Sequence, residues 1–219
     1  MDNLDAVKTI VQIVAFIFSV IFHEIAHGLV AYRFGDDTAK ISGRLSLNPL
    51  VHIDPIGSIL VPGLLFLSGT NFLFGWAKPV PVNPYRLKGG VSAYRWVSLA
   101  GVLTNFVLAV IAALVIKITV QFLGFDFNNL GVILFVAFLQ INIVLAVFNF
   151  LPLPGFDGFN FLTTFKPIAQ VFSKSPLANP FFMARYGLVL SIAILFVFMP
   201  FINLIFNFIF NLFINFFGL

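Results

Sequence analysis

Residues 130–151 form a run of 22 residues without one ionisable side chain. As a helix, such a run is long enough to cross the roughly 30 Å hydrocarbon core of a membrane. Residues 9–32 form a second run, whose ionisable groups, apart from the tyrosine at its end, are His23, Glu24 and His27. Only 9% of the chain is charged and 60% is hydrophobic, whereas soluble domains are near a quarter charged. The chain is therefore predicted to be a multi-pass membrane protein.

Five apolar stretches are visible, at residues 9–32, 56–74, 97–116, 130–151 and 186–219. We expect an all-α polytopic fold with about five to six apolar segments, in a single integral-membrane domain over residues 1–219. Core spans are expected at about 9–32, 97–116 and 130–151, and C-terminal helices at about 181–218. Pro200 either kinks one long C-terminal helix or separates two.

The stretch at 56–74 is interrupted by Gly57, Pro62, Gly63 and Gly69, so it either spans the membrane or enters and returns. The positive-inside rule helps to decide. If the stretch is re-entrant and the N-terminus lies outside, ten of the twelve Lys and Arg residues fall on the cytoplasmic side. If it spans, the best division is eight against four. The charge distribution favours the re-entrant arrangement.

Two loops have strand-like patterns. Residues 41–47 alternate apolar and polar side chains, and residues 76–84 contain three prolines, which favour an extended edge. The sequence therefore predicts a small membrane-associated β region within about residues 35–90, between the first and third apolar segments. Such an edge either pairs with an unwound substrate or serves as a structural collar.

The first apolar run contains the pattern His23-Glu24-Ile25-Ala26-His27. On a helix, residues four apart share a face, so His23 and His27 can present ring nitrogens to one metal ion while Glu24 lies beside it. Glu24 is the chain's only glutamate and two of its three histidines flank it, so a chance match is improbable. A polar patch at a helix end is the alternative.

A catalytic zinc ion usually has three protein ligands. The absence of cysteine excludes thiolates, and six residues remain as candidates. Asp157 stands out because Pro152, Pro154 and Gly155 break the helix before it, and because it must reach the depth of His23 and His27. That match requires the first and fourth stretches to cross in the same direction. A simple turn residue before Gly158 is the alternative. The six candidates are His52, Asp36, Asp37, Asp54, Asp126 and Asp157.

The chain resembles the site-2 protease family of intramembrane zinc metalloproteases over nearly its whole length. Four blocks carry the resemblance: HEIAH, GRLSLNPLVHIDPIG with GWAKPVPVNP, Gly101-Val102-Leu103-Thr104-Asn105, and NFLPLPGFDG. The resemblance implies one zinc ion per chain, held by His23, His27 and Asp157, with Glu24 as the catalytic base. The chain is similar to short members that lack a PDZ or CBS domain. It departs from the family pattern at Val102, Gly155 and Phe159.

Three further residues are candidates for supporting roles. The resemblance suggests that Asn149 holds the substrate carbonyl near zinc, and an interhelical hydrogen bond is the alternative. Asn105 has the same two possible roles. His52 either orders the site through a bond behind a metal ligand or bonds a backbone carbonyl.

These features together predict a zinc-dependent endopeptidase that cleaves transmembrane segments of single-span membrane proteins, as in regulated intramembrane proteolysis. A zinc transporter or sensor, and a catalytically silent scaffold that binds membrane helices, are the alternatives. The net charge of +4 is spread over membrane-flanking loops, which indicates contact with the lipid bilayer and no nucleic acid. We expect a location in the cell membrane, with the N-terminus outside and the active site toward the cytoplasm. The sequence predicts no oligomeric state.

Overall fold

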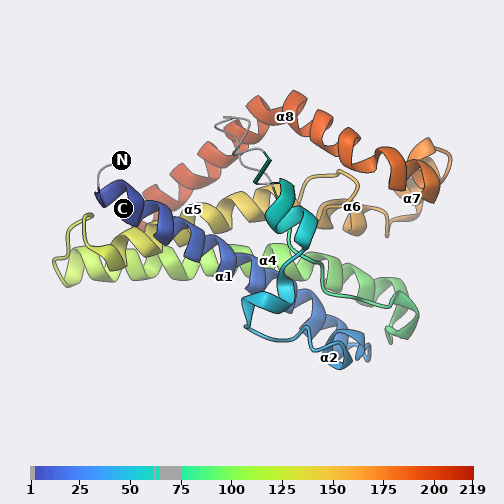
Figure 1. Ribbon diagram of the computed structural model, residues 1–219, viewed down its shortest axis with the longest axis horizontal. Coiled ribbons are helices and arrows are strands. Elements are labelled where there is room, and N and C mark those ends of the chain that lie inside the picture. Colours follow the sequence, from blue (N-terminus) through green and yellow to red (C-terminus); the bar gives the residue numbers. More distant parts are fainter. Residues whose placement is uncertain (1–2, 62, 65–74) are drawn as a thin grey trace.

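Three long helices form the body of the molecule. A computed structural model describes residues 3–61, 63–64 and 75–219, and Figure 1 shows α1 (Asn3–Arg33), α4 (Gly90–Lys117) and α5 (Leu130–Asn149) side by side. α4 packs against both of the other helices, and α1 also contacts α5. α1 and α5 run in the same direction and α4 runs in the opposite one. The C-terminal ends of α1 and α5 therefore lie toward the same end of the body.

Shorter elements connect and cover this body. α2 (Thr38–Ile41) follows α1, and α6 (Asp157–Leu162) and α7 (Lys166–Ser173) follow α5. Short 3-10 turns occur at Pro49–His52, Pro84–Arg86 and Pro176–Ala178, and π-helical turns at Pro55–Leu60 and Ile118–Phe122. The last helix is α8 (Pro180–Phe217), which starts beside α7 and arches over the body toward the end where the N-terminus lies (Figure 1).

Four of the described helices are long and apolar enough to cross a membrane: Val7–Arg33, Gly90–Phe122, Leu130–Asn149 and Phe196–Phe217. The protein is therefore a helical multi-pass membrane protein, with four candidate spans in its described part where five to six apolar segments were expected. Residues 62 and 65–74 lie outside the described residues, and with them most of the stretch expected to span or to re-enter at 56–74.

The C-terminal stretch forms one helix, where the sequence allowed either one kinked helix or two. Pro200 lies inside α8, and because proline has no N–H, one helical hydrogen bond is missing there. The helix bends as it passes over the body (Figure 1). Its C-terminal half joins α4 and α5 in a core that includes Ile202 and Phe213.

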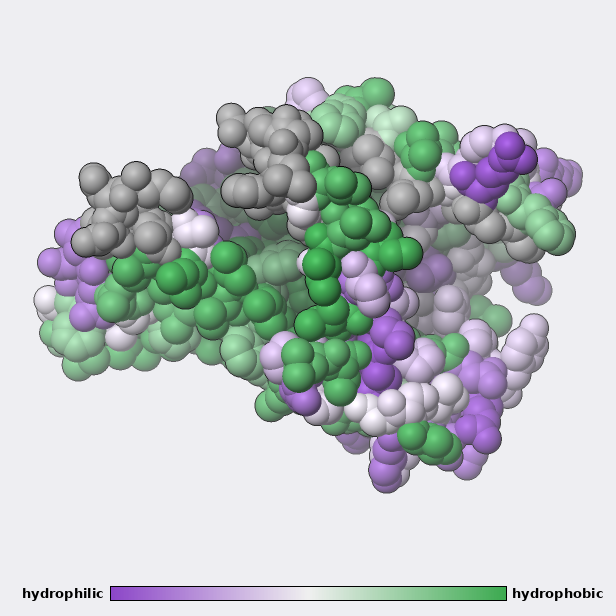
Figure 2. Space-filling view, viewed as in Figure 1, coloured by the Kyte–Doolittle hydropathy of each residue, from purple (hydrophilic) through white to green (hydrophobic). Residues whose placement is uncertain are grey.

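The same core contains small residues on α4 where helices meet. Ala109, Ala112 and Ala113 are buried against Leu139 and Ile143 of α5. Small side chains let the backbones of membrane helices approach closely, which strengthens van der Waals packing. Figure 2 shows hydrophobic side chains over the middle of the body, with hydrophilic ones toward the end that contains α2 and α7 and a smaller group at the opposite end.

The predicted β region is wrong for the part of the chain that the structure describes, which contains no strand. Residues 38–41 are helical, and the N–H groups of Ser42, Gly43 and Arg44 bond back to that turn. Gly43 also has a φ of 66°, which a strand does not allow. The alternating pattern at 41–47 was therefore misleading, because a helical turn satisfies its backbone.

Residues 75–83, called the 75–83 segment below, have no regular secondary structure. Pro79 and Pro81 have no N–H to offer to a ladder. The N–H groups of Trp76, Lys78 and Val80 bond to three separate acceptors, which are Gly57 O, His52 O and the Glu24 carboxylate. The segment is thus held in place residue by residue instead of by a neighbouring strand.

Candidate metal centre

Two distant parts of the chain bring the candidate ligands together. His23 and His27 lie one turn apart in the last third of α1, and Asp157 is the first residue of α6. After α5 ends, the chain turns back so tightly that a Cβ on Gly158 would lie 2.1 Å from the carbonyl oxygen of Phe150. Only glycine fits at that position, and its absence of a side chain allows Asp157 to return beside α1.

The three side chains converge on one point. The Nε2 atoms of His23 and His27 are 3.1 Å apart, and each lies 3.2 Å from Oδ2 of Asp157. Zinc bonds to histidine and carboxylate are close to 2.0–2.1 Å, so two ligands in a tetrahedral site lie about 3.3–3.4 Å apart. The observed triangle is within a few tenths of an ångström of that spacing. It forms a metal-ligand group of three residues.

The other nitrogen of each imidazole shows which atom bears the hydrogen. Nδ1 of His27 lies 2.7 Å from the carbonyl oxygen of Val97, and Nδ1 of His23 lies 2.6 Å from Oδ1 of Asn105. A carbonyl oxygen only accepts hydrogen bonds, so Nδ1 is the donor in each neutral ring. Both Nε2 atoms therefore present lone pairs to the point where they meet.

The environment of the Asp157 carboxylate favours a cation at this point. Oδ2 of Asp157 is buried and has no hydrogen-bond partner among the described residues, although two Nε2 atoms lie 3.2 Å away. Three atoms with lone pairs are thus crowded together without a proton between them, which is costly in a buried site unless a cation is shared. The donor set of two imidazoles and one carboxylate is typical of zinc.

α4 closes the back of the centre through Gly101. A Cβ at that position would lie 2.3 Å from Cε1 of His23 and 2.5 Å from Nε2 of both histidines. The close approach of α4 is what places Val97 and Asn105, one turn on either side of Gly101, against the two imidazoles. Gly101 therefore acts through its lack of a side chain.

Glu24 lies beside the ligands and contacts the 75–83 segment. Its Oε2 accepts a hydrogen bond of 2.7 Å from the N–H of Val80. Glu24, the three ligands and the 75–83 segment line a cavity of about 300 Å³. The rest of its wall consists of Tyr94, Val97, Ser98, Asn149, Gly155 and Asn160. The only glutamate of the chain thus reaches the same space as the metal ligands.

The three supporting residues expected from the sequence lie in different places. Asn149 lines the cavity, and its Nδ2 donates to the carbonyl oxygen of Leu145 at 3.0 Å. Asn105 is fully buried behind His23, away from the cavity wall. His52 is buried too: it contacts Ser46 O through Nε2 at 2.8 Å, and its carbonyl oxygen accepts from Lys78. His52 therefore anchors the 75–83 segment and is not part of the ligand group.

Three groups that form hydrogen bonds with Asn105 or Glu24 were not identified from the sequence. Ser19 and Asn142 form hydrogen bonds with Asn105, and both are fully buried. The signal for Asn142 was its position two turns before Asn149, in a helix whose only other polar side chain is the exposed Gln140. The backbone N–H of Val80 was also missed, and no side-chain pattern could have revealed it.

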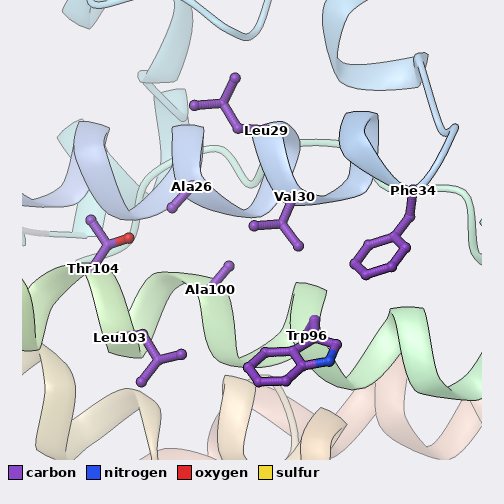
Figure 3. Close-up of a pocket in the computed structure, with 8 residues that line it drawn as sticks. All are labelled: Ala26, Leu29, Val30, Phe34, Trp96, Ala100, Leu103 and Thr104. Atoms are coloured by element: carbon purple, nitrogen blue, oxygen red, sulfur yellow. The ribbon is translucent and has the colours of Figure 1, made fainter.

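A second hollow, of about 490 Å³, lies between α1 and α4. Its lining is almost wholly apolar: Val30 and Phe34 point from the α1 side toward α4, where Ala100 and Trp96 lie (Figure 3). It has no titratable side chain, whereas the candidate metal ligands line the smaller cavity.

Comparisons with known proteins find relatives that are all named as zinc metalloproteases. The chain is 40% identical over 159 residues to a Bacillus subtilis protein named "Putative zinc metalloprotease YwhC", which covers 71% of this chain and 68% of that protein. It is 34% and 30% identical to proteins named "Putative zinc metalloprotease Rip2" from Mycolicibacterium smegmatis and Mycobacterium tuberculosis. These two alignments cover 70% and 68% of this chain but only 56% and 55% of the relatives, little more than half of their length. No family model and no solved structure matches the chain.

Proposed function

The chain belongs to the site-2 protease family, and from that premise we propose that it is a zinc-dependent endopeptidase that cleaves peptide bonds within the membrane. The observation that carries the proposal is the convergence of His23, His27 and Asp157 beside Glu24 in one cavity. The names of the relatives are those of zinc metalloproteases. They favour neither a zinc transporter nor a silent scaffold.

The ligand residues prepare the site for one metal ion. His23, His27 and Asp157 would hold zinc, which when bound supplies Lewis acidity toward a water molecule and the scissile carbonyl. The buried Val97 carbonyl and Asn105 amide keep the imidazole hydrogens on Nδ1. Both imidazoles are thereby oriented before any metal arrives, which increases affinity because little order is lost on binding.

Glu24 moves the proton. Its Oε2 is occupied by the Val80 N–H, so Oε1 is the atom that takes a proton from the attacking water and returns it to the leaving amine. General acid–base catalysis of this kind contributes about 10²–10⁴-fold to a rate. The bond from Val80 fixes the direction in which the carboxylate faces.

The substrate is proposed to be a single-span membrane protein whose helix is locally unwound. A helix hides its carbonyl groups in hydrogen bonds, and a cavity of about 300 Å³ accepts only a short extended stretch. Asn149 lies in the wall with an amide that now donates to its own helix. We propose that this amide turns toward the substrate carbonyl as negative charge develops there.

Replacement of Glu24 by Gln tests the proposal. Glu24→Gln keeps the size of the side chain and all three metal ligands but removes the base. We expect cleavage of a co-expressed single-span reporter to fall by at least about 10²-fold, with zinc content by metal analysis unchanged. Asp126→Asn is the matched control, since Asp126 lies in an exposed loop and cleavage should match the wild type.

Cleavage that persists in Glu24→Gln at the wild-type rate would overturn the assigned role of Glu24. Zinc content below one ion per chain in the wild type, with no loss on His23→Ala, would overturn the metal site itself.

A further inference from the structure

A chain of hydrogen-bonded polar side chains crosses the three helices of the body behind the metal centre. Ser19 of α1, Asn105 of α4 and Asn142 of α5 are each fully buried. Nδ2 of Asn142 donates to Oγ of Ser19 at 2.8 Å, and Nδ2 of Asn105 donates to Oδ1 of Asn142 at 2.7 Å. Asn105 then accepts from His23 at 2.6 Å. This series of hydrogen bonds therefore ends at His23, one of the three candidate metal ligands.

The contact of Asn142 with Phe138 sets the direction of the hydrogen bonds from Asn142 to His23. Nδ2 of Asn142 also lies 2.8 Å from the backbone carbonyl oxygen of Phe138, which can only accept. The amide of Asn142 therefore turns its nitrogen to Phe138 and its oxygen to Asn105. Asn105 must donate to that oxygen, so its own Oδ1 faces His23, and the hydrogen of His23 is held on Nδ1.

His27 reaches the same state by a shorter route. Its Nδ1 bonds directly to the backbone carbonyl oxygen of Val97, which cannot rotate. Asn105, by contrast, is an amide that could turn over and present its NH₂ group to His23. That reversal would favour a hydrogen on Nε2, the atom that faces the metal position. Asn142 opposes it, because a reversed Asn105 would place oxygen against oxygen at the 2.7 Å contact. The backbone carbonyl of Ser19 adds a longer contact of 3.4 Å with Nδ2 of Asn105.

We propose that Asn142 is a positioning residue for the metal centre: through Asn105 it keeps the hydrogen of His23 on Nδ1 and leaves Nε2 free to bind the ion. The inference rests on the proposed function for its purpose, since an oriented ligand matters only where a metal is bound. Ser19 supports the same arrangement as the second acceptor for Asn142.

Zinc affinity is the first test. In purified full-length protein, Asn142→Leu should weaken zinc binding, measured by competition with a chelator, by about 10–100-fold, the usual effect of removing a group behind a metal ligand. Gln140→Leu is the matched control, because Gln140 lies on the same helix with its side chain exposed, and its affinity should equal that of the wild type. Wild-type affinity in Asn142→Leu would overturn the proposal.

A double variant separates positioning from packing. If Asn142 acts through Asn105, then Asn142→Leu should weaken zinc binding no further once Asn105→Leu is present, because the two residues form one pathway. Losses of affinity that simply multiply would mean that Asn142 acts independently, and would overturn the proposal. If Asn142→Leu does not fold, Asn142→Ala replaces it in the same cycle.

The tautomer of His23 can be observed without zinc. In the zinc-free wild type at a pH where both imidazoles are neutral, ¹⁵N chemical shifts should show His23 and His27 with hydrogen on Nδ1. In the Asn142 variant, His23 should shift toward hydrogen on Nε2 while His27 remains unchanged as an internal control. An unchanged His23 would refute the positioning role. This result is independent of proteolysis, so it stands or falls separately from the proposed function.

Discussion

Asp36 shows how one buried carboxylate can hold a functional site together from outside it. Its side chain is fully buried just after α1. It accepts hydrogen bonds from the N–H and hydroxyl of Thr38 and, at 2.6 Å, from the N–H of Asn83. The last of these bonds ties the end of α1 to the end of the 75–83 segment. Asp36 was a candidate metal ligand in the sequence, but these bonds give it a structural role.

The ionisation of Asp36 makes this tie dependent on pH. Burial opposes the charged form, but the bonds from Thr38 and Asn83 and the nearby Arg86 outweigh it, so the pKa of Asp36 lies below its usual value. A carboxyl group with a lowered pKa stabilises the fold at pH values above its unfolded pKa of about 3.9. That stabilisation is lost as the pH falls through the lower pKa of the folded state.

Asp36→Asn should therefore destabilise the protein at pH 7 and do so less in acid. We expect a loss of about 1–3 kcal/mol in the free energy of unfolding at neutral pH, and a shrinking difference from the wild type as the pH falls below about 4. Helix content during titration with a denaturing detergent measures this. Asp37→Asn is the control, since Asp37 pairs with Arg86 on the surface and such pairs contribute at most about 1 kcal/mol. A gap that is constant with pH would contradict the role given to the Asp36 charge.

Some of the site could be predicted from single residues and some could not. The sequence pattern was enough to select His23, Glu24 and His27, because residues four apart on a helix lie on the same face. Asp157 followed from the helix-breaking residues around it. The role of Asn105 could not be predicted, because it depends on which way an amide turns, and that depends on Phe138 through Asn142.

At the scale of elements, the 75–83 segment covers the carboxylate of Glu24. Val80 is nearly buried, and its N–H binds Glu24. Arg44 donates to the carbonyl oxygen of Lys78 at 2.5 Å, and the N–H of Lys78 donates to His52 O at 2.9 Å. The segment is thus held from the side of residues 44–52 and presents one backbone donor to Glu24.

Val80→Pro removes this donor, because proline has no N–H. The residues on both sides, Pro79 and Pro81, are already prolines. If the bond orients Glu24, kcat/KM for a single-span reporter should fall by about 10-fold or more, the effect of losing a hydrogen bond to a charged group. Zinc content should be unchanged, because Glu24 is not one of the three ligands.

Val80→Ala is the matched control, because it shortens the side chain and keeps the N–H. We expect it to retain most of the activity. Equal losses in the two variants would show that the side chain of Val80 matters and that its N–H does not.

Element prediction succeeded where hydrophobicity decides and failed where local bonds decide. Long apolar runs without charges have few alternatives to helices in a membrane, and α1, α4 and α5 contain the runs expected at 9–32, 97–116 and most of 130–151. The strand predicted at 41–47 rested on alternation alone. It failed because the turn after α2 satisfies those N–H groups, and Gly43 takes a left-handed conformation.

At the scale of the whole molecule, the direction of the helices places the candidate metal centre toward one end of the helical body. α1 and α5 run in parallel with α4 against them (Figure 1), so the C-terminal ends of α1 and α5 share one end with the metal ligands. Ten of the twelve Lys and Arg residues lie in residues 33–95 and 166–185, which connect to the body at that end. Lys8 and Lys117 lie near the opposite ends of α1 and α4. The positive-inside rule then favours a site that faces the cytoplasm.

Single cysteines can test this orientation directly, because the chain has none of its own. Lys88→Cys and Asn128→Cys place thiols at exposed positions, near the start of α4 and in the loop before α5. With a membrane-impermeant thiol reagent on intact cells, we expect Asn128→Cys to be labelled. Lys88→Cys should be labelled only after the membrane is opened. The reverse pattern would invert the proposed orientation, and labelling of both on intact cells would contradict the span assigned to α4.

The distance along the chain between the metal ligands also bears on biosynthesis. His27 and Asp157 are separated by 130 positions, so at about 5–20 residues per second a ribosome needs roughly 7–26 s to travel from one to the other. Throughout that interval the nascent chain contains His23 and His27 but not yet Asp157, the third residue of the candidate ligand group. The three-residue ligand group can therefore form only after α5 has been synthesised and the chain has turned back toward α1.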